Sequence, residues 1–125
     1  MAYSYDPTNI FARILRGEIP NRTVIETEHT LAFEDINPSA PVHVLVIPKG
    51  PYVCFDHFAA DASAEEIADF HRAVAGICRK LGISPGEGGQ GYRVLSNAGH
   101  HGHQEVPHYH MHLLAGRPLG PMLAR

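Results

Sequence analysis

The run His108–Leu114, in which three histidines alternate with bulky apolar residues, is the feature that most constrains the fold. A β-strand turns successive side chains to opposite faces, so a strand here would place all three imidazoles on one face, over roughly 13 Å. A helix would scatter them around its axis. The run therefore predicts a strand that carries a row of imidazoles, His108, His110 and His112.

The composition is typical of an ordinary globular chain, with 125 residues, 44% hydrophobic and 18% charged. The net charge of -3, with histidine neutral, lacks the basic footprint of a nucleic-acid-binding protein. The sequence shows no signal-peptide pattern and no apolar run near the roughly 20 residues of a membrane span. We therefore expect a cytoplasmic protein without nucleic-acid or membrane partners. The two cysteines form no CxxC pair, which argues against a disulfide scaffold.

Apolar periodicity and turn residues predict two helices and five strands. The first helix is expected to begin at Asp6 and Pro7 and to end near Gly17. The second begins at a capping box on Ser63 and ends near Gly82. Strands are expected at residues 23–26, 30–35, 42–47, 92–97 and 108–114, and residues 83–91 are expected to form a glycine-rich loop. This order predicts an α+β fold with a mainly antiparallel sheet, in which the apolar strand 42–47 is buried on both faces.

The histidine row supports two kinds of chemistry, besides the structural alternative of a solvated strand face. Neutral imidazoles bind zinc and similar ions, and Glu105 or His43 could supply a third ligand. An imidazole nitrogen is also a nucleophile that forms a covalent intermediate with phosphorus. In that case His110 attacks, while its neighbours in the row and the buried His43 orient it and stabilise charge.

The run HYHMHLL resembles the signature of the histidine triad (HIT) family, in which three histidines alternate with apolar residues and two apolar residues follow. Further blocks resemble the family in its order and spacing: Asn9–Phe11, Gly17–Pro20, Ala32–Pro38, Pro41–His43, Val46–Lys49, Asn97 and Gly102–Val106. The likeness covers residues 8 to 117 and is greatest to the nucleotide-binding, HINT-like branch. A glutamine typically stands at position 112 in the nucleotide-transferase branch, so His112 speaks against that branch.

This resemblance implies one HIT domain over residues 1–125, with a core at 8–117 and a C-terminal tail at 118–125. It also implies a HIT-like sheet of about five strands, with one long helix and a short N-terminal helix, and a homodimer. The implied activity is hydrolysis of purine nucleoside phosphoramidates or related nucleotide conjugates at the α-phosphate, through a covalent nucleotidyl-histidine. The alternatives are a dinucleoside polyphosphate hydrolase and a nucleotide-binding or interaction module with little turnover.

The resemblance also implies a role for each matching residue. His110 is the expected nucleophile. His108 and His112 are expected to hold the phosphate and to tune the reactivity of the nucleophile. Asn97, Gln104, Glu105 and Val106 lie beside the phosphate, and Asp35 binds the ribose hydroxyls. The expected apolar slot for the base consists of Ile10, Phe11, Ile14, Phe33 and Ile36, for which a role in the core is an equally good expectation.

Two positions depart from the best-known members of the family. Glu105 stands where the animal phosphoramidases have serine, so a carboxylate near the leaving group could change the leaving-group preference. His103 stands where glycine is common. The cysteines that bind structural zinc in some members have no counterpart here, and we expect no metal and no cofactor.

Overall fold

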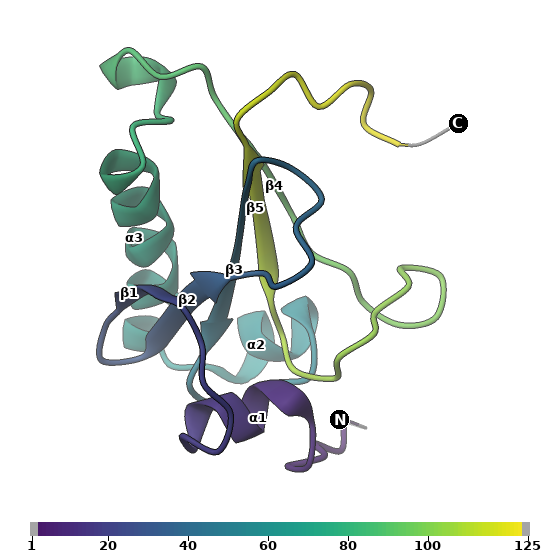
Figure 1. Cartoon of the computed structure of the whole chain (residues 1–125). Helices are drawn as coiled ribbons and strands as arrows, with labels where there is room; N and C mark the ends of the chain where they lie inside the picture. The colour runs from purple at the N-terminus through teal and green to yellow at the C-terminus, as the bar shows by residue number, and fades with distance from the viewer. Residues whose placement is uncertain (1–2, 124–125) are drawn as a thin grey trace.

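A five-stranded antiparallel sheet forms the centre of the computed structural model, which describes residues 3–123 (Figure 1). The sheet order is β1-β2-β3-β5-β4, and all four neighbouring pairs are antiparallel. This arrangement confirms the expected α+β fold. The strands are β1 (Thr23–Glu26), β2 (Thr30–Glu34), β3 (Val42–Pro48), β4 (Arg93–Leu95) and β5 (Met111–Ala115).

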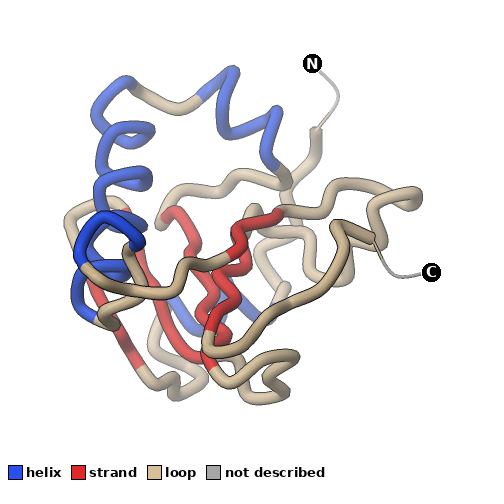
Figure 2. The backbone as a smooth tube through the Cα atoms, turned by 90° about the horizontal axis from the view of Figure 1, so that it is seen from above, coloured by secondary structure: helices blue, strands red, loops and turns tan. Residues whose placement is uncertain are grey.

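The long helix is α3 (Ala64–Lys80), which runs beside the sheet (Figure 1). It begins at the predicted capping box, in which the Ser63 hydroxyl accepts from the Glu66 N–H and the Glu66 carboxylate accepts from the Ser63 N–H. Two shorter helices, α1 (Ile10–Leu15) and α2 (Phe55–Asp61), pack near one end of the sheet (Figure 1), and a 3-10 turn spans Pro85–Glu87. Figure 2 shows the helices, in blue, beside the strands, in red. No helix in residues 3–123 is both long and apolar enough to cross a lipid bilayer.

The central strand β3 divides the apolar core into two clusters, because its side chains are buried on both faces, as predicted. Val44 and Val46 belong to the cluster under α3, and Leu45 and Ile47 belong to the cluster under α1. The α3 side also holds Tyr109, whose ring stacks on two phenylalanines with centroid distances of 5.1 and 5.2 Å. This aromatic stack anchors one side of the segment His108–Leu114, here called the triad segment, so the histidines of the segment lie on its other side.

The helices differ from the prediction in the start of α1 and in the presence of α2. Helix α1 begins at Ile10, because the Asn9 side chain caps it by accepting from the Ala12 N–H. Asp6 instead accepts from the Thr8 N–H in a turn before the helix. Helix α2 was not predicted; it has only seven residues, and its N-cap residue Cys54 makes no capping hydrogen bond with its side chain.

The triad strand also differs, because ladder pairing in β5 begins only at Met111. The residues just before it are held by other bonds. The Tyr109 N–H donates to the Tyr52 carbonyl at 2.7 Å, and the Ser96 hydroxyl donates to the His110 carbonyl at 2.7 Å. Strand β4 is likewise shorter than the predicted strand 92–97, and the 3-10 turn lies within the predicted loop 83–91.

Candidate active site

The imidazoles gather on the face of the sheet that carries α1. In the β3–β5 ladder, His43 pairs with Leu114 and Leu45 pairs with His112, and directly opposed residues share a face. His110 precedes β5, and its ring lies 5.1 Å from the ring of His112. Strands β3 and β5 are far apart in the chain, and their pairing thus brings His43 close to His110 and His112.

Two adjoining cavities open on this face. The smaller one, about 300 Å³, is lined by His43, His110, His112, Ser39 and Asn97 among others. The larger one, about 600 Å³, is lined mainly by apolar residues. The residues that border both are Phe11, Asp35, Asn37, Leu45, Glu105 and Val106. The site is therefore an apolar slot that leads into a polar, imidazole-lined end.

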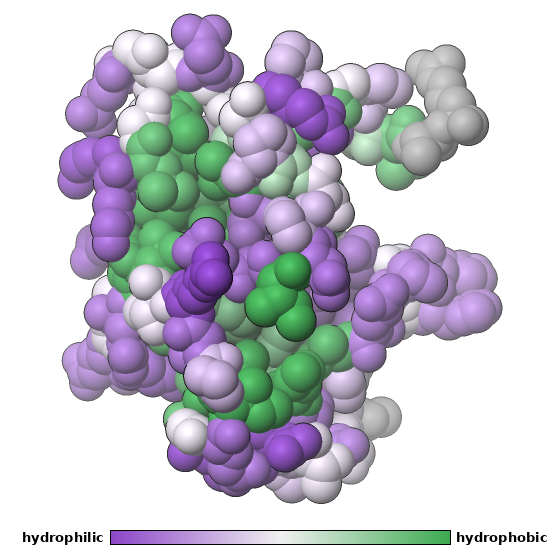
Figure 3. Space-filling model, in the orientation of Figure 1, coloured by the Kyte–Doolittle hydropathy of each residue, from purple (hydrophilic) through white to green (hydrophobic). Residues whose placement is uncertain are grey.

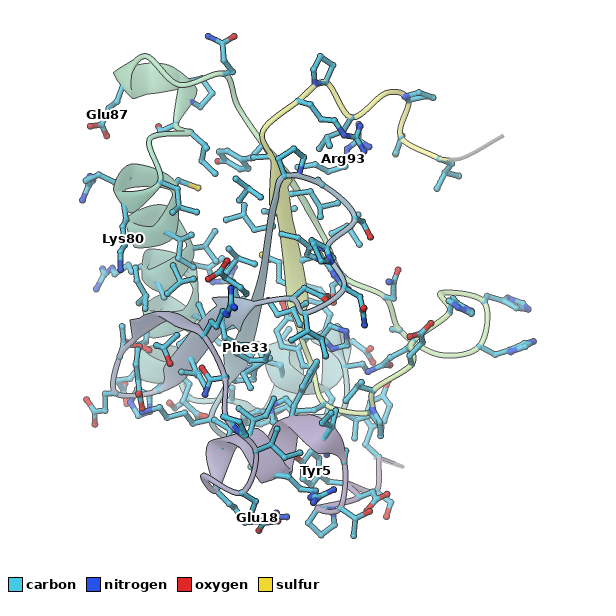
Figure 4. The ribbon with its side chains drawn as sticks, viewed as in Figure 1. Tyr5, Glu18, Phe33, Lys80, Glu87 and Arg93 are labelled. Atoms are coloured by element: carbon cyan, nitrogen blue, oxygen red, sulfur yellow. The ribbon has the colours of Figure 1, made fainter. Side chains whose placement is uncertain are left out.

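The apolar slot contains all five residues expected to contact a base. Phe11, Ile14 and Phe33 are buried and also belong to the core, whereas Ile10 is exposed and Ile36 is 87% exposed. Figure 4 shows Phe33 between the sheet and α1, and Figure 3 shows apolar side chains gathered above α1. Sequence reasoning missed further lining residues, because each lies in a turn or on a strand that reads as ordinary core: Ile19, Pro20, Asn21, Arg22 and Leu45.

Hydrogen bonds determine which nitrogen of His110 carries the proton. Its Nδ1 lies 2.7 Å from the carbonyl oxygen of His108, and a carbonyl can only accept. Nδ1 therefore carries the hydrogen, and Nε2 of the neutral ring keeps its lone pair. Since the ring of His110 lines the smaller cavity, this lone pair is the nucleophile that the site offers.

The hydrogen bonds of His43 and His112 determine their tautomers in the same way. The Ser39 N–H donates to His43 Nδ1 at 3.0 Å, so His43 carries its hydrogen on Nε2. That group donates to His112 Nδ1 at 2.9 Å, which leaves the hydrogen of His112 on Nε2. Asp35 Oδ2 lies 3.4 Å from His43 Nε2. The polar end of the site thus contains a fixed N–H donor on His112 beside the lone pair of His110.

His108 occupies a different environment from the other two triad histidines. Its side chain is 0% exposed, its Nε2–H donates to the Pro48 carbonyl at 2.8 Å, and its Nδ1 accepts from the Tyr5 hydroxyl at 2.6 Å. Both ring nitrogens are therefore occupied, and the ring does not line the smaller cavity. The phosphate contact expected of His108 stays a prediction, and the contact that joins His108 to the cavity in this structure is the hydrogen bond of its carbonyl with His110.

Burial keeps these imidazoles neutral at neutral pH. It lowers the pKa of His108 and of His112 to about 4 and also lowers the pKa of His43. Burial lowers the pKa of His110 as well, although its hydrogen bond to the His108 carbonyl and the charges of Asp35 and Glu105 act in the opposite direction. A neutral imidazole is the form that can attack an electrophile, so the environment favours nucleophilic chemistry.

Asp35, His43 and His112 are also close enough to be considered as metal ligands, with one ligand atom of each within 4.8 Å of the others. An ion on His43 Nε2 would displace the hydrogen from that nitrogen. The neutral ring would then carry its hydrogen on Nδ1, against the N–H of Ser39. The hydrogen bonds of the cluster therefore fit a relay of imidazoles better than a metal centre.

The loop before the triad lies beside the polar end. Glu105 and Val106 line both cavities, whereas the Gln104 amide donates to the carbonyls of Val53, just before α2, and of Val106 in the loop, at 2.7 and 3.0 Å. His103 adopts the left-handed backbone conformation, with φ at 59°, that glycine adopts freely. Its Nε2 lies 3.1 Å from Glu105 Oε1, and both side chains are exposed. Such a φ is uncommon for a residue with a side chain, although histidine adopts it more often than most residues do.

Comparison with known proteins agrees with this geometry. The model of the HIT domain family matches residues 16–119. The chain is 58% identical over its whole length to an uncharacterised HIT-like protein of Azospirillum brasilense, of which it covers 99%. It is 44% identical to the purine nucleoside phosphoramidase of Escherichia coli over 115 residues, 92% of each chain.

Solved structures show the same fold. A HIT family hydrolase from Clostridium thermocellum superposes with a TM-score of 0.82 at 36% identity, covering 94% of this chain and 97% of that one. A histidine triad protein from Clostridium difficile gives a TM-score of 0.80 at 38% identity, covering 91% of this chain and 95% of the other. The family model, the relatives and the structures agree, and the chain belongs to the HIT domain family.

Proposed function

We propose that this protein is a HINT-like hydrolase that cleaves purine nucleoside phosphoramidates or related nucleotide conjugates at the α-phosphate. The observation that carries the proposal is the hydrogen bond from His110 Nδ1–H to the His108 carbonyl, which leaves the Nε2 lone pair at the polar end of the slot. The 44% identity to a purine nucleoside phosphoramidase supports the choice of substrate class. The free thiols of Cys54 and Cys78 suit the cytoplasm, where thiols stay reduced.

The two cavities match the parts of such a substrate. The apolar slot of about 600 Å³ accepts the purine between α1 and β2. Asp35 borders both cavities and accepts the ribose hydroxyls, and the α-phosphate enters the polar end beside Asn97 and the backbone of Val106. This placement puts the phosphorus next to His110 and the Nε2–H of His112 next to a phosphate oxygen.

The reaction then takes two steps. His110 Nε2 attacks phosphorus, the bond from phosphorus to the leaving nitrogen breaks, and the amine departs with a proton taken from solvent. Water next attacks the phosphorus and gives up a proton to solvent, the bond to His110 breaks, and nucleoside monophosphate is released with the His110 lone pair restored. The Nε2–H of His112 donates to the phosphate oxygens in both steps, where negative charge accumulates. Asp35 and His43 stabilise this donor through the His43–His112 hydrogen bond.

Removing the nucleophile tests the proposal directly. His110→Ala should reduce kcat/KM for an adenosine phosphoramidate by a factor on the order of 10⁴ or more, because no other group in the site offers a fixed lone pair to phosphorus. Nucleoside monophosphate should still bind the variant, since the apolar slot remains. Steady-state kinetics and calorimetry measure the two quantities.

His101→Ala is the matched control, since His101 is exposed and lies outside both cavities, and it should keep full turnover. Turnover should also persist in chelator. Unchanged turnover in His110→Ala would refute the proposal. A wild-type protein that binds nucleotide tightly but releases no product would support a binding module, and faster cleavage of a diadenosine polyphosphate would support the dinucleotide hydrolase.

The acid dependence of the reaction follows from the pKa shift of His110. The neutral form attacks, and burial lowers the pKa of this ring below the ordinary 6.5, so the ring stays neutral to lower pH than a solvated imidazole does. The acidic limb of kcat/KM should therefore lie below pH 6.5, measured with a substrate that does not titrate between pH 4 and 8. A limb above pH 6.5 would show that His110 is not the titrating nucleophile.

Glu105 should influence the choice of leaving group, because its carboxylate borders both cavities. In Glu105→Gln, kcat/KM for a conjugate with an anionic leaving group should rise relative to one with a cationic amine, by a factor of about 2 to 5 for an exposed charge. As salt screens the Glu105 carboxylate, the ratio of the wild type should converge on that of Glu105→Gln. Equal changes for both substrates would show that the carboxylate does not act on the leaving group and only contacts the loop.

The free edge of the sheet supports the homodimer that we propose. Strand β4 is hydrogen-bonded within the described chain only to β5, and Val94 and Tyr92 are exposed there. A cavity of about 630 Å³ lies beside this edge, and its lining includes Tyr92, Arg93 and Arg117. Pairing of β4 with β4 of a second copy would satisfy both edges and continue the sheet.

Light scattering should therefore give the wild type about twice the chain mass of 13.7 kDa. Val94→Asp should shift the protein towards the monomer, because pairing would bury the added carboxylate against its copy. Ile36→Asp offers a control, since Ile36 is also exposed but lies on the slot. A monomeric wild type at micromolar concentration would contradict the proposed dimer.

A further inference from the structure

Tyr5 lies 103 residues before His108 in the chain but contacts it in the fold. Its hydroxyl lies 2.6 Å from His108 Nδ1, and the two rings meet edge to face with centroids 5.5 Å apart. Figure 4 places Tyr5 beside α1, in the segment that leads into that helix. The same segment is anchored a second time by Tyr3, whose hydroxyl donates to Asp56 Oδ2 at 2.6 Å.

The direction of the Tyr5 bond is fixed by the other nitrogen of His108. Nε2 faces the Pro48 carbonyl at 2.8 Å and must donate, so Nδ1 of the neutral ring must accept. Burial raises the pKa of Tyr5, and the phenol therefore keeps the hydrogen that it donates. Because His108 is 0% exposed and the Tyr5 hydroxyl occupies Nδ1, removal of that hydroxyl takes away the one donor that this buried nitrogen has among the described residues.

His108 in turn holds the nucleophile. Its carbonyl oxygen accepts from His110 Nδ1 at 2.7 Å, and this bond is what places the lone pair on His110 Nε2. The ring of Phe11 lies 5.0 Å from His110 and 6.3 Å from His108, edge-on to each, so the three rings pack together. A shift of the His108 ring would therefore move both the carbonyl and the packing that orient His110.

We propose that Tyr5 is a positioning residue of the active site, which fixes His108 so that the His108 carbonyl holds His110 in the attacking tautomer and orientation. This inference rests on the proposed function for its kinetic consequence. Its structural part, the coupling from Tyr5 through His108 to the His110 ring, stands without any substrate. The competing role for Tyr5 is a plain anchor of the N-terminal segment, which Tyr3 also serves.

Tyr5→Phe and Tyr3→Phe form a matched pair that separates the two roles. Each removes one hydroxyl from the same segment, but only the first leaves a buried histidine nitrogen without its donor. In Tyr5→Phe, kcat should fall by a factor of about 10 to 100, the range expected when a reacting group is displaced by a fraction of an ångström to about 1 Å, while KM changes little. In Tyr3→Phe, both parameters should stay within about twofold of the wild type.

Nitrogen-15 NMR of the histidine rings gives the readout that needs no substrate. In Tyr5→Phe, the His108 Nδ1 and His110 Nδ1–H signals should both shift, and in Tyr3→Phe neither should. Thermal melts of the two variants show whether each is folded at the assay temperature. Should Tyr5→Phe not be folded there, the same spectra are recorded below its melting temperature.

Unchanged His110 signals in folded Tyr5→Phe, or equal kinetic losses in the two variants, would overturn the inference. A wild type without turnover would refute the proposed function, and in that case the spectra alone decide whether Tyr5 positions His110. Failure of the function and failure of the inference are thus distinguishable.

Discussion

The arrangement of the site depends on one hydrogen bond, from His110 Nδ1–H to the carbonyl of His108. An imidazole can place its lone pair on either nitrogen, and a backbone carbonyl removes that freedom because it only accepts. The neighbouring His112 is held in the opposite tautomer, since His43 donates to its Nδ1. The neighbouring rings of His110 and His112 therefore present different atoms to the cavity: a lone pair on His110 and an N–H donor on His112.

The fold supplies the rigidity that these bonds need. Strand β3 is buried on both faces, and the clusters under α1 and α3 fix it between them. Tyr109 anchors the triad segment on the α3 side, so the alternation of the strand directs His110 to the α1 side. The apolar cluster on that side is also the floor of the slot, and Phe11 belongs to both. The proposed base site is therefore an extension of the core.

The strand alternation, the capping box at Ser63 and the apolar run of β3 are local patterns, and for this reason the sequence predicted the sheet and the long helix well. The presence of His43 on the buried strand could be predicted in the same way. The bond between Tyr5 and His108 could not, because the two residues are 103 positions apart and nothing in the local pattern marks Tyr5. The burial of the His108 ring could not be predicted either, because all three histidines alternate with apolar residues in the same way.

The covalent step tests the role of His110 most directly. A single turnover of adenosine phosphoramidate, quenched at alkaline pH and followed by peptide mapping, locates the nucleotidyl group. If His110 is the nucleophile, an adduct on its Nε2 forms before nucleoside monophosphate appears and then decays. Product without any adduct, or an adduct on His112, would contradict this role.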